Sequence, residues 1–205
     1  MASFGELVLV LGDMHIPSRA SKIPAPFKRM LVPGRMQHVI CTGNCPTNDA
    51  ELQSLAPNLH FVAGDWDNDT SATYPESRVV QVGPFRIGVI HGHQIVPWKS
   101  HAALAATRRK LNVDILITGH THQNSVVIED DCCYINPGSI TGATSTVTSD
   151  VVPSFVLLAV QEDKVVCYVY ELKGNDVEVS KTEFAKVKKE TVVSKDPALL
   201  DSLLQ

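Results

Sequence analysis

The sequence predicts an α/β protein built from two packed β-sheets flanked by helices. In the first part of the chain, short β-rich runs alternate with plausible helices, which is typical of a sheet with helices packed on it. After Tyr74-Pro75-Glu76 the pattern changes to successive strands with one intervening helix. The 205 residues fit one domain, which we place at residues 1–186, followed by a C-terminal tail at residues 187–205.

The first part of the chain is expected to form three strands and two helices. Each apolar run ends in a cluster of polar residues and glycine, so chemistry should lie at the strand ends. The expected elements are strands at residues 7–11, 39–42 and 59–63, with helices at residues 26–31 and 48–55 between them.

The second part is expected to begin with a hairpin, because Gly83-Pro84 is a turn signal between two apolar runs. A segment rich in alanine and leucine predicts the one long helix. The expected elements are strands at residues 79–82 and 85–90, a helix at residues 100–111, and strands at residues 115–118, 125–128, 133–136, 155–160 and 165–172.

The tail carries a possible short helix. Asp196 is a suitable N-cap and Pro197 a suitable first helical residue. The leucines that would share one face of this helix are Leu199, Leu200, Leu203 and Leu204. A docking helix and a frayed end fit this pattern equally well, because so short a helix is marginal unless it packs.

Composition indicates a cytosolic protein. The net charge of -4 argues against nucleic acid and against direct attraction to anionic lipid. No apolar run approaches the roughly 20 residues of a membrane-spanning helix, and the N-terminus has no signal-peptide pattern. The small basic clusters Lys28-Arg29 and Arg108-Arg109-Lys110 are interpreted as solvated helix faces.

The five cysteines show neither a zinc-type spacing nor the pattern of a secreted disulfide protein, so we expect all five to be reduced. The adjacent pair Cys132 and Cys133 is compatible with redox chemistry. In a strand, however, neighbouring side chains point to opposite faces, which favours one buried thiol as a packing residue.

Histidines mark three strand ends. Five of the eight histidines lie in Gly12-Asp13-Met14-His15, His91-Gly92-His93 and Gly119-His120-Thr121-His122. Two further strand ends add Gly43-Asn44 and Gly64-Asp65-Trp66-Asp67. In an extended segment, residues two apart point the same way, so Asp13 with His15 could hold one ion and His120 with His122 another. Mixed nitrogen and oxygen ligands suit Mn, Zn or Fe, and two ions roughly 4 Å apart would activate water.

The motifs resemble a known family. The sequence resembles the calcineurin-like metallophosphoesterases in an ordered set of motifs: Asp13-x-His15, Gly43-Asn44, Gly64-Asp65-x-Asp67, His91 and Gly119-His120-x-His122. Within this superfamily, it resembles the vacuolar protein sorting-associated protein 29 family in four longer segments: Leu11-Gly12-Asp13-Met14-His15-Ile16-Pro17, Cys41-Thr42-Gly43-Asn44, Ile90-His91-Gly92-His93-Gln94 and Ile135-Asn136-Pro137-Gly138-Ser139. The resemblance covers residues 6–184 and implies a four-layer α/β/β/α metallophosphoesterase fold.

By this resemblance, two divalent ions, Zn or Mn, would be weakly bound. The implied ligands are Asp13, His15 and His122 for one ion, Asp65, His91 and His120 for the second, and Asn44 between them. His93 is the one possible catalytic group. A role near the substrate or behind the ligands and a role as an ordinary hydrogen-bonded histidine fit equally well.

Two departures from the family pattern argue against efficient catalysis. Active members commonly carry aspartate where this chain has Asn44, and a neutral amide is a poorer bridge between two cations. Many also carry histidine where this chain has Trp66, and an indole cannot act as a general acid. Because Asp65 stands where asparagine is usual, ligand charge is relocated and metal binding is still expected.

The resemblance implies a non-catalytic scaffold subunit of retromer, a complex that sorts cargo at endosomes in endosome-to-Golgi retrograde transport. Its implied partner is the α-solenoid scaffold subunit, vacuolar protein sorting-associated protein 35, bound through the metal-site rim Ile95, Val96, Pro97 and Trp98. Without the resemblance, Ile95 and Val96 would be assigned to sealing the start of the next helix. Membrane association would be indirect, through the complex.

A second implied surface would recruit regulators of small GTPases through Leu157, Tyr168 and Tyr170. Strand alternation alone is equally consistent with burial of these residues beneath a helix. Two other functions stay open: a weakly active Mn- or Zn-dependent phosphodiesterase, and a scaffold whose cavity holds no metal in cells.

Overall fold

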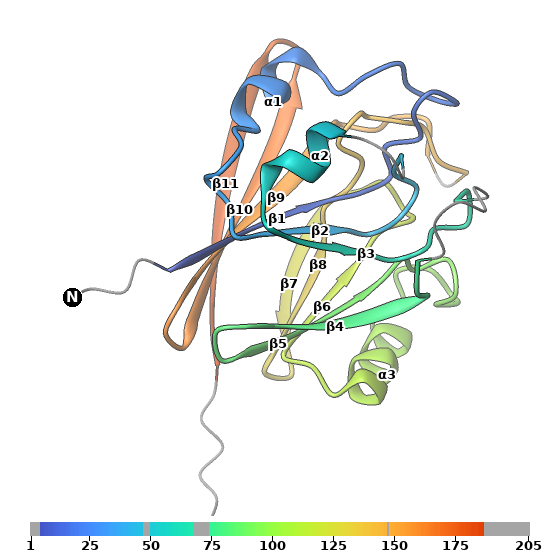
Figure 1. Cartoon of the computed structure of the whole chain (residues 1–205). Helices are drawn as coiled ribbons and strands as arrows, with labels where there is room; N and C mark the ends of the chain where they lie inside the picture. Colours follow the sequence, from blue (N-terminus) through green and yellow to red (C-terminus); the bar gives the residue numbers. More distant parts are fainter. Residues whose placement is uncertain (1–4, 47–49, 68–73, 147, 187–205) are drawn as a thin grey trace, which may run out of the picture.

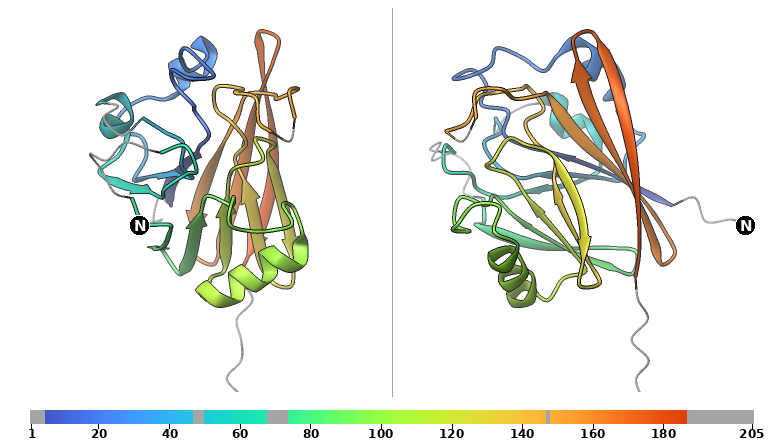
Figure 2. Two further views of the ribbon diagram at one scale, coloured as in Figure 1. Left: turned by 90° about the vertical axis from the view of Figure 1, so that its right-hand side faces the viewer. Right: turned by 180° about the vertical axis from the view of Figure 1, so that it is seen from behind.

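Two β-sheets stack face to face and carry helices on both outer surfaces (Figures 1 and 2). The computed structural model describes residues 5–46, 50–67, 74–146 and 148–186. The four-layer α/β/β/α prediction is confirmed. The expected tail helix, and the first two residues of the helix expected at residues 48–55, lie outside the described residues.

The first sheet combines parallel and antiparallel strands in the order β11-β10-β9-β1-β2-β3. Its parallel strands are β1 (Glu6–Leu11), β2 (His38–Cys41) and β3 (Asn58–Phe61), and its antiparallel strands are β9 (Ser154–Gln161), β10 (Lys164–Lys173) and β11 (Asp176–Ala185). Helices α1 (Ala25–Met30) and α2 (Ala50–Leu55) pack on its outer face, where Phe27 and Leu52 meet Leu9 and Leu11.

The second sheet has the order β4-β5-β6-β8-β7. Its strands are β4 (Ser77–Val82), β5 (Phe85–Ile90), β6 (Ile115–Thr118), β7 (Ser125–Glu129) and β8 (Cys132–Asn136). Helix α3 (His101–Leu111) covers its outer face through Leu104 and Leu111. The Ser100 hydroxyl accepts a bond from the Ala103 N–H and caps the helix start, and Asn112 ends it with φ 52°.

The main core fills the space between the two sheets. Alternate residues of each strand point into it, so Val8 and Val10 of β1 meet Ile115 and Ile117 of β6 there. Strands β1, β2 and β3 run parallel, as do β5, β6 and β8. The loops that leave the carboxyl ends of these strands therefore converge at one edge of the sandwich.

Strand β11 was not predicted. Its residues are mostly exposed because it is an edge strand outside the helix-covered area, so its sequence carries only a weak apolar alternation. The turn before it contained a usable signal, because Gly174-Asn175 is a favoured hairpin dipeptide and Gly174 has φ 64°.

The expectation of five reduced cysteines is wrong at one pair: Cys41 and Cys45 form a disulfide. Gly43 and Asn44 between them have positive φ, so the chain turns back sharply, which their spacing alone does not reveal. Cys132, Cys133 and Cys167 are free and buried. Both members of the adjacent pair are buried, because Cys133 faces the inter-sheet core and Cys132 faces the layer under α3.

Among the described residues, no helix has the length and apolar character needed to span a bilayer. The helices are short, and their apolar side chains pack on the sheets.

Candidate metal centre

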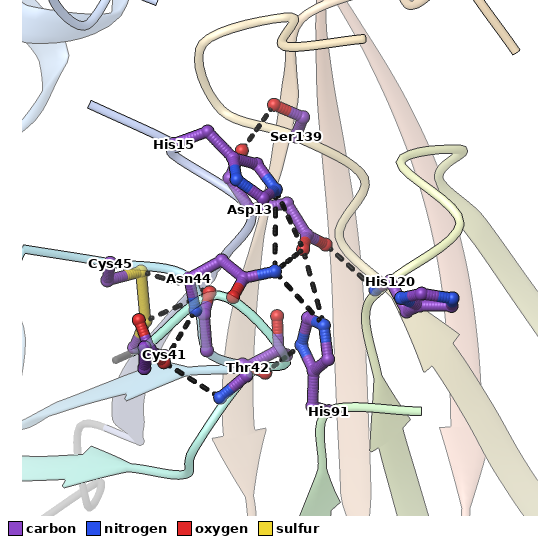
Figure 3. Close-up of a disulfide and its surroundings, with 12 residues drawn as sticks. Asp13, His15, Cys41, Thr42, Asn44, Cys45, His91, His120 and Ser139 are labelled. Carbon is purple, nitrogen blue, oxygen red and sulfur yellow. Dashed lines mark hydrogen bonds and ion pairs between the residues drawn. A yellow bond between two sulfur atoms is a disulfide. The ribbon is translucent and has the colours of Figure 1, made fainter. Parts of the chain in front are cut away.

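Seven predicted ligands meet at the converging strand ends, and most of them are drawn in Figure 3. They come from both sheets, so the centre spans the top of the inter-sheet core. The contributions are Asp13 and His15 after β1, Asn44 after β2, Asp65 after β3, His91 after β5, and His120 and His122 after β6.

Asp13, His15 and His122 form one ligand group, with one donor atom from each within 4.8 Å of the others. The Nε2 atoms of His15 and His122 lie 3.2 Å apart, and the Asp13 Oδ1 atom lies 3.5 Å from His122 Nε2. All three side chains are buried. Two imidazoles and a carboxylate that converge in this way offer three donors to one ion.

Asp65, His91 and His120 form a second group under the same distance limit. The Asp65 Oδ1 atom is 3.0 Å from His91 Nε2, and its Oδ2 atom is 3.7 Å from His120 Nδ1. The Asp65 side chain is 31% exposed, whereas His91 is fully buried. His120 thus turns its Nδ1 atom toward the Asp65 carboxylate, while its Nε2 atom is buried without a hydrogen-bond partner.

Backbone carbonyls orient the histidines. His91 donates its Nδ1–H to the Thr42 carbonyl at 2.7 Å, and His122 donates its Nδ1–H to the Ala143 carbonyl at 2.6 Å. Since a carbonyl only accepts, Nδ1 of each ring carries a proton, and Nε2 of each ring is the nitrogen that faces the site.

Asp13 is held from both sides. Its Oδ2 atom accepts the His120 backbone N–H at 2.9 Å, and its carbonyl accepts the Ser139 hydroxyl at 2.7 Å. We did not assign a site role to Thr42 or Ser139 from the sequence. The signal for both was already present, because they lie inside two of the segments that support the family resemblance.

The backbone of the site corrects one sequence argument. The residues were expected to be extended, yet five ligands have left-handed φ: Asp13 48°, His15 47°, Asn44 55°, His120 69° and His122 57°. Such conformations are unfavourable for these residue types and are concentrated at functional sites. The pair His120 and His122 is also divided between the two groups, so it does not hold one ion together.

The pKa values of Asp13, His15 and Asp65 are shifted in the direction that favours cation binding. Burial alone would raise the pKa of Asp13, but the His122 hydrogen bond and the nearby His91 and His15 lower it. The His91 hydrogen bond chiefly lowers the pKa of Asp65. Burial lowers the pKa of His15 to about 4. The carboxylates are therefore ionised and His15 is neutral near pH 7, as metal ligands must be.

His91 shows the opposite balance. Burial alone would lower its pKa, but the bond to Asp65, the nearby Asp13 charge and the Thr42 carbonyl together raise it. Binding of a cation at Nε2 would therefore release a proton when His91 carries one.

Asn44 lies between the two groups, but its orientation does not bridge them. Its Nδ2 atom is 3.4 Å from Asp13 Oδ1, 3.0 Å from Asp65 Oδ1 and 3.1 Å from His91 Nε2. Its Oδ1 atom instead accepts the Trp66 backbone N–H at 2.9 Å. An amide nitrogen is not a metal ligand, so Asn44 would have to rotate and break the Trp66 bond in order to bridge.

Trp66 and Arg19 narrow the entrance. The Arg19 guanidinium lies 4.6 Å from the centre of the Trp66 ring and donates to the Thr144 carbonyl at 2.9 Å. Together with His15 they help to line a cavity of only about 20 Å³, room for about one water molecule. Trp66 and Arg19 therefore lie at the edge of the small space beside the two ligand groups.

His93 lies beside the second group. Its ring centre is 5.3 Å from that of His91 and 6.2 Å from that of His120, and its Nδ1 atom is buried without a partner. Burial lowers its pKa. It belongs to neither ligand group.

The loop after β5 is divided between core and surface. Ile95 is buried, whereas Val96 is 72% exposed and Trp98 is 43% exposed. The Trp98 ring stands edge-on to the ligand His120, with centres 4.5 Å apart. Only Ile95 therefore seals the structure beneath the loop, while Val96, Pro97 and Trp98 face outward beside the metal centre.

Leu157, Tyr168 and Tyr170 lie together on the outer face of the first sheet. Leu157 pairs with Tyr168 across β9 and β10, and all three are half-buried. Tyr170 stacks on Phe155 at 4.6 Å. The predicted patch is therefore one continuous surface, anchored at one end by the layer under α1.

Comparison with known proteins identifies the family. A model of the calcineurin-like phosphoesterase superfamily domain matches residues 7–163. Vacuolar protein sorting-associated protein 29 of Schizosaccharomyces pombe is 39% identical over 186 residues, which cover 88% of this chain and 98% of that protein. This chain belongs to the vacuolar protein sorting-associated protein 29 family.

Solved structures of that family agree. The Cryptosporidium parvum protein has a TM-score of 0.84 at 40% identity, covering 90% of this chain and 100% of that one. The Entamoeba histolytica protein complexed with Zn²⁺ has a TM-score of 0.81 at 42% identity, covering 87% and 99%. A family member can thus hold zinc, and the two ligand groups of this chain provide nitrogen and oxygen donors that fit such an ion.

Proposed function

We propose that this chain is a non-catalytic scaffold subunit of retromer, which binds the α-solenoid subunit through its metal-site face and acts in endosome-to-Golgi retrograde transport. The observation that carries the proposal is the exposed loop Val96-Pro97-Trp98 beside His120. Exposed apolar side chains of this size are costly in water and mark interaction surfaces. The family name, which refers to vacuolar protein sorting, supports a role in transport.

In this proposal the metal centre organises the docking face. Two ions, Zn or Mn, would be held by the two ligand groups and would join loops that follow four strands, β1 and β3 of the first sheet and β5 and β6 of the second. The neutral Asn44 makes one ion weakly bound, and the narrow entrance at Trp66 and Arg19 disfavours substrates. When bound, the ions could polarise a phosphoryl group, but the chain supplies no general acid at Trp66.

Binding of the purified solenoid subunit, measured by isothermal titration calorimetry, tests the docking face. The Val96→Asp variant should weaken binding about 30-fold or more, because a charge replaces an exposed apolar contact at the centre of the loop. The matched control is Val179→Asp, which makes the same change at an exposed valine of β11 in the other sheet. Equal affinities of wild type and Val96→Asp would refute the assignment.

The patch of Leu157, Tyr168 and Tyr170 is proposed to recruit regulators of small GTPases. Its support is the continuous, half-buried apolar face formed by β9 and β10 on the sheet opposite α3. The complex would reach endosomal membranes through its other subunits.

The alternative function is a weakly active Mn- or Zn-dependent phosphodiesterase. Two complete ligand groups favour it. Hydrolysis of bis-p-nitrophenyl phosphate with manganese tests it, and the activity should disappear in both Asp65→Ala and His91→Ala. Turnover that survives both substitutions would come from a contaminant, which would remove this alternative.

A further inference from the structure

The outer face of the second sheet is only partly covered. Helix α3 packs on β6 and β8, whereas β7 extends beyond it as an edge strand (Figure 2). A hollow of about 350 Å³ lies between α3 and the β7–β8 hairpin. Its apolar lining comes from Ile95, Trp98, Leu104, Val127 and Tyr134.

Val127 shows that this face is open. It points outward from β7 and is 45% exposed, whereas every residue of the neighbouring strand β8 is buried. The first sheet carries two helices on its outer face, while α3 is the one helix of the described residues on this face. A second element of helix size would complete the layer.

The described chain ends close to this hollow. The Lys186 ammonium donates to the Asp114 carboxylate and to the Pro84 carbonyl, both at 2.7 Å, which places the exit beside the C-terminal end of α3. A second hollow there is lined by Lys186, Asp130 and Asp131. Asp130 directly follows Glu129, which lines the first hollow, so consecutive residues at the hairpin turn line the two hollows.

Charge and length both suit the segment that follows. Lys188 and Lys189 follow in the sequence soon after Lys186, the last described residue, which shares a hollow with Asp130 and Asp131. Residues 187–195 can span about 30 Å when extended, whereas α3, with eleven residues, is about 16 Å long. The linker therefore reaches the hollow with length to spare.

The last ten residues carry the matching apolar face. In a helix that begins after Asp196, Leu199, Leu200, Leu203 and Leu204 share one side, and nine residues of helix measure about 14 Å. Such a helix is marginal in isolation and needs an apolar surface.

We propose that residues 196–205 bind as a short helix in the hollow between α3 and the β7–β8 hairpin of the same chain. Since Ile95 and Trp98 line this hollow and also belong to the metal-site loop, the docked tail would lie next to the face proposed to bind the solenoid subunit. The inference goes beyond the proposed function, and its test needs no partner protein.

Paramagnetic NMR on the full chain tests this inference. A spin label at Ser202→Cys should broaden the amide signals of Leu104 and Val127 and leave Leu157, on the other sheet, unchanged. The three free cysteines are buried, so labelling is directed to position 202. Val127→Asp should lower the docking constant about tenfold or more, because a charge replaces an apolar contact.

The matched control is Ile128→Asp. Ile128 is also 45% exposed on β7 but is not among the residues that line the hollow, so this variant should keep the broadening. Leu203→Asp in the tail should abolish it without touching the folded domain. Absence of broadening, broadening centred on Leu157, or equal broadening in Val127→Asp would overturn the proposal.

A mixed sample separates the rival occupants. Spin-labelled chain without isotope is added to isotope-labelled chain without a spin label. Intramolecular docking predicts no broadening in this sample. Broadening of Leu104 and Val127 there would mean that a second copy fills the hollow and would also overturn the proposal.

Discussion

Two clusters of histidines and carboxylates lie at opposite ends of the same parallel strands. Beyond the carboxyl ends of β1 and β3 the candidate ligands of the first sheet join histidines that follow β5 and β6, and together they form two groups. At the amino ends of β1 and β2, Glu6 contacts His38 at 2.9 Å, and His38 contacts His60 of β3 at 3.1 Å. Within the described residues, this second cluster contains no group of three ligands that converge on one point.

The difference lies in the backbone. Glu6, His38 and His60 belong to regular strands, so each neighbour contributes one side chain and the contacts form a linear chain in which His38 uses both ring nitrogens. The metal ligands follow the strands in loops, and left-handed residues such as Asp13 and His122 turn several donors toward one point. Histidines and carboxylates in contact are therefore not sufficient for a metal site. Their donor atoms must also converge on one point.

Asp13→Asn should show the largest difference between the two ends. It removes the buried carboxylate of the first group, and we expect the affinity for Zn²⁺ or Mn²⁺ at that group to fall about 100-fold or more, since even residues behind a ligand are worth 10- to 100-fold. Titration calorimetry of chelator-treated protein measures this. Glu6→Gln is the matched control and should leave the affinity unchanged. An equal loss of affinity in Glu6→Gln would show that the two clusters do not differ in metal binding.

Asn44→Asp should change both the stability of the metal-free protein and its affinity for metal. In the metal-free protein a third carboxylate would replace the amide that contacts Asp13 and Asp65, so the free energy of unfolding should fall by about 1–3 kcal/mol. With manganese the bridging carboxylate should raise the affinity for the weaker ion about tenfold. Thermal unfolding with and without Mn²⁺ should therefore show a larger metal-induced shift than in wild type, and a smaller shift would contradict the bridging argument.

His60→Gln should have the smallest effect, visible only in acid. Burial, followed by His38 and Arg78, lowers the pKa of His60 to about 4, below the unfolded value near 6.5. As the pH falls from 6.5 to 4, the unfolded state takes up a proton that the folded state does not, so wild-type stability decreases across that window. The substitution should reduce this acid-induced loss of unfolding free energy by about 1–2 kcal/mol, a figure lowered because the His60 side chain is partly exposed.

Denaturant unfolding at pH 7 and pH 4.5, with chelator present, measures the His60 effect. Between pH 7 and pH 4.5 the variant should lose less unfolding free energy than wild type, whereas above pH 6.5 the pH dependence of the two proteins should be nearly the same. Identical pH dependence of the two proteins would show that His60 titrates normally.

Much of this centre could be predicted from the sequence. Asp13, His15, His91, His120 and His122 stand out because each follows an apolar run, and the ends of neighbouring parallel strands must meet. Their division into two groups came from the family resemblance, whereas alternation alone would have assigned His120 and His122 to one ion. Alternation failed there because it assumes extended backbone, and both residues have left-handed φ.

Contacts between distant segments could not be read from the pattern. Ser139 and Thr42 hold Asp13 and His91 through single hydrogen bonds, and strand β11 is stabilised by pairing with β10 along its whole length although its own alternation is weak. The exposed Val96 and the buried Ile95 are adjacent and similarly apolar, so only the packing around the loop distinguishes them.

By itself the sequence determined the layered α/β architecture and indicated the candidate ligands, because apolar periodicity and the residues at strand ends are local properties of the chain. The tertiary structure decided the rest. It turned the Asn44 amide nitrogen toward the candidate ligands, brought Arg19 and Trp66 together at the entrance, and left a hollow beside α3. Each of these outcomes depends on the relative position of segments far apart in the chain, which local pattern does not specify.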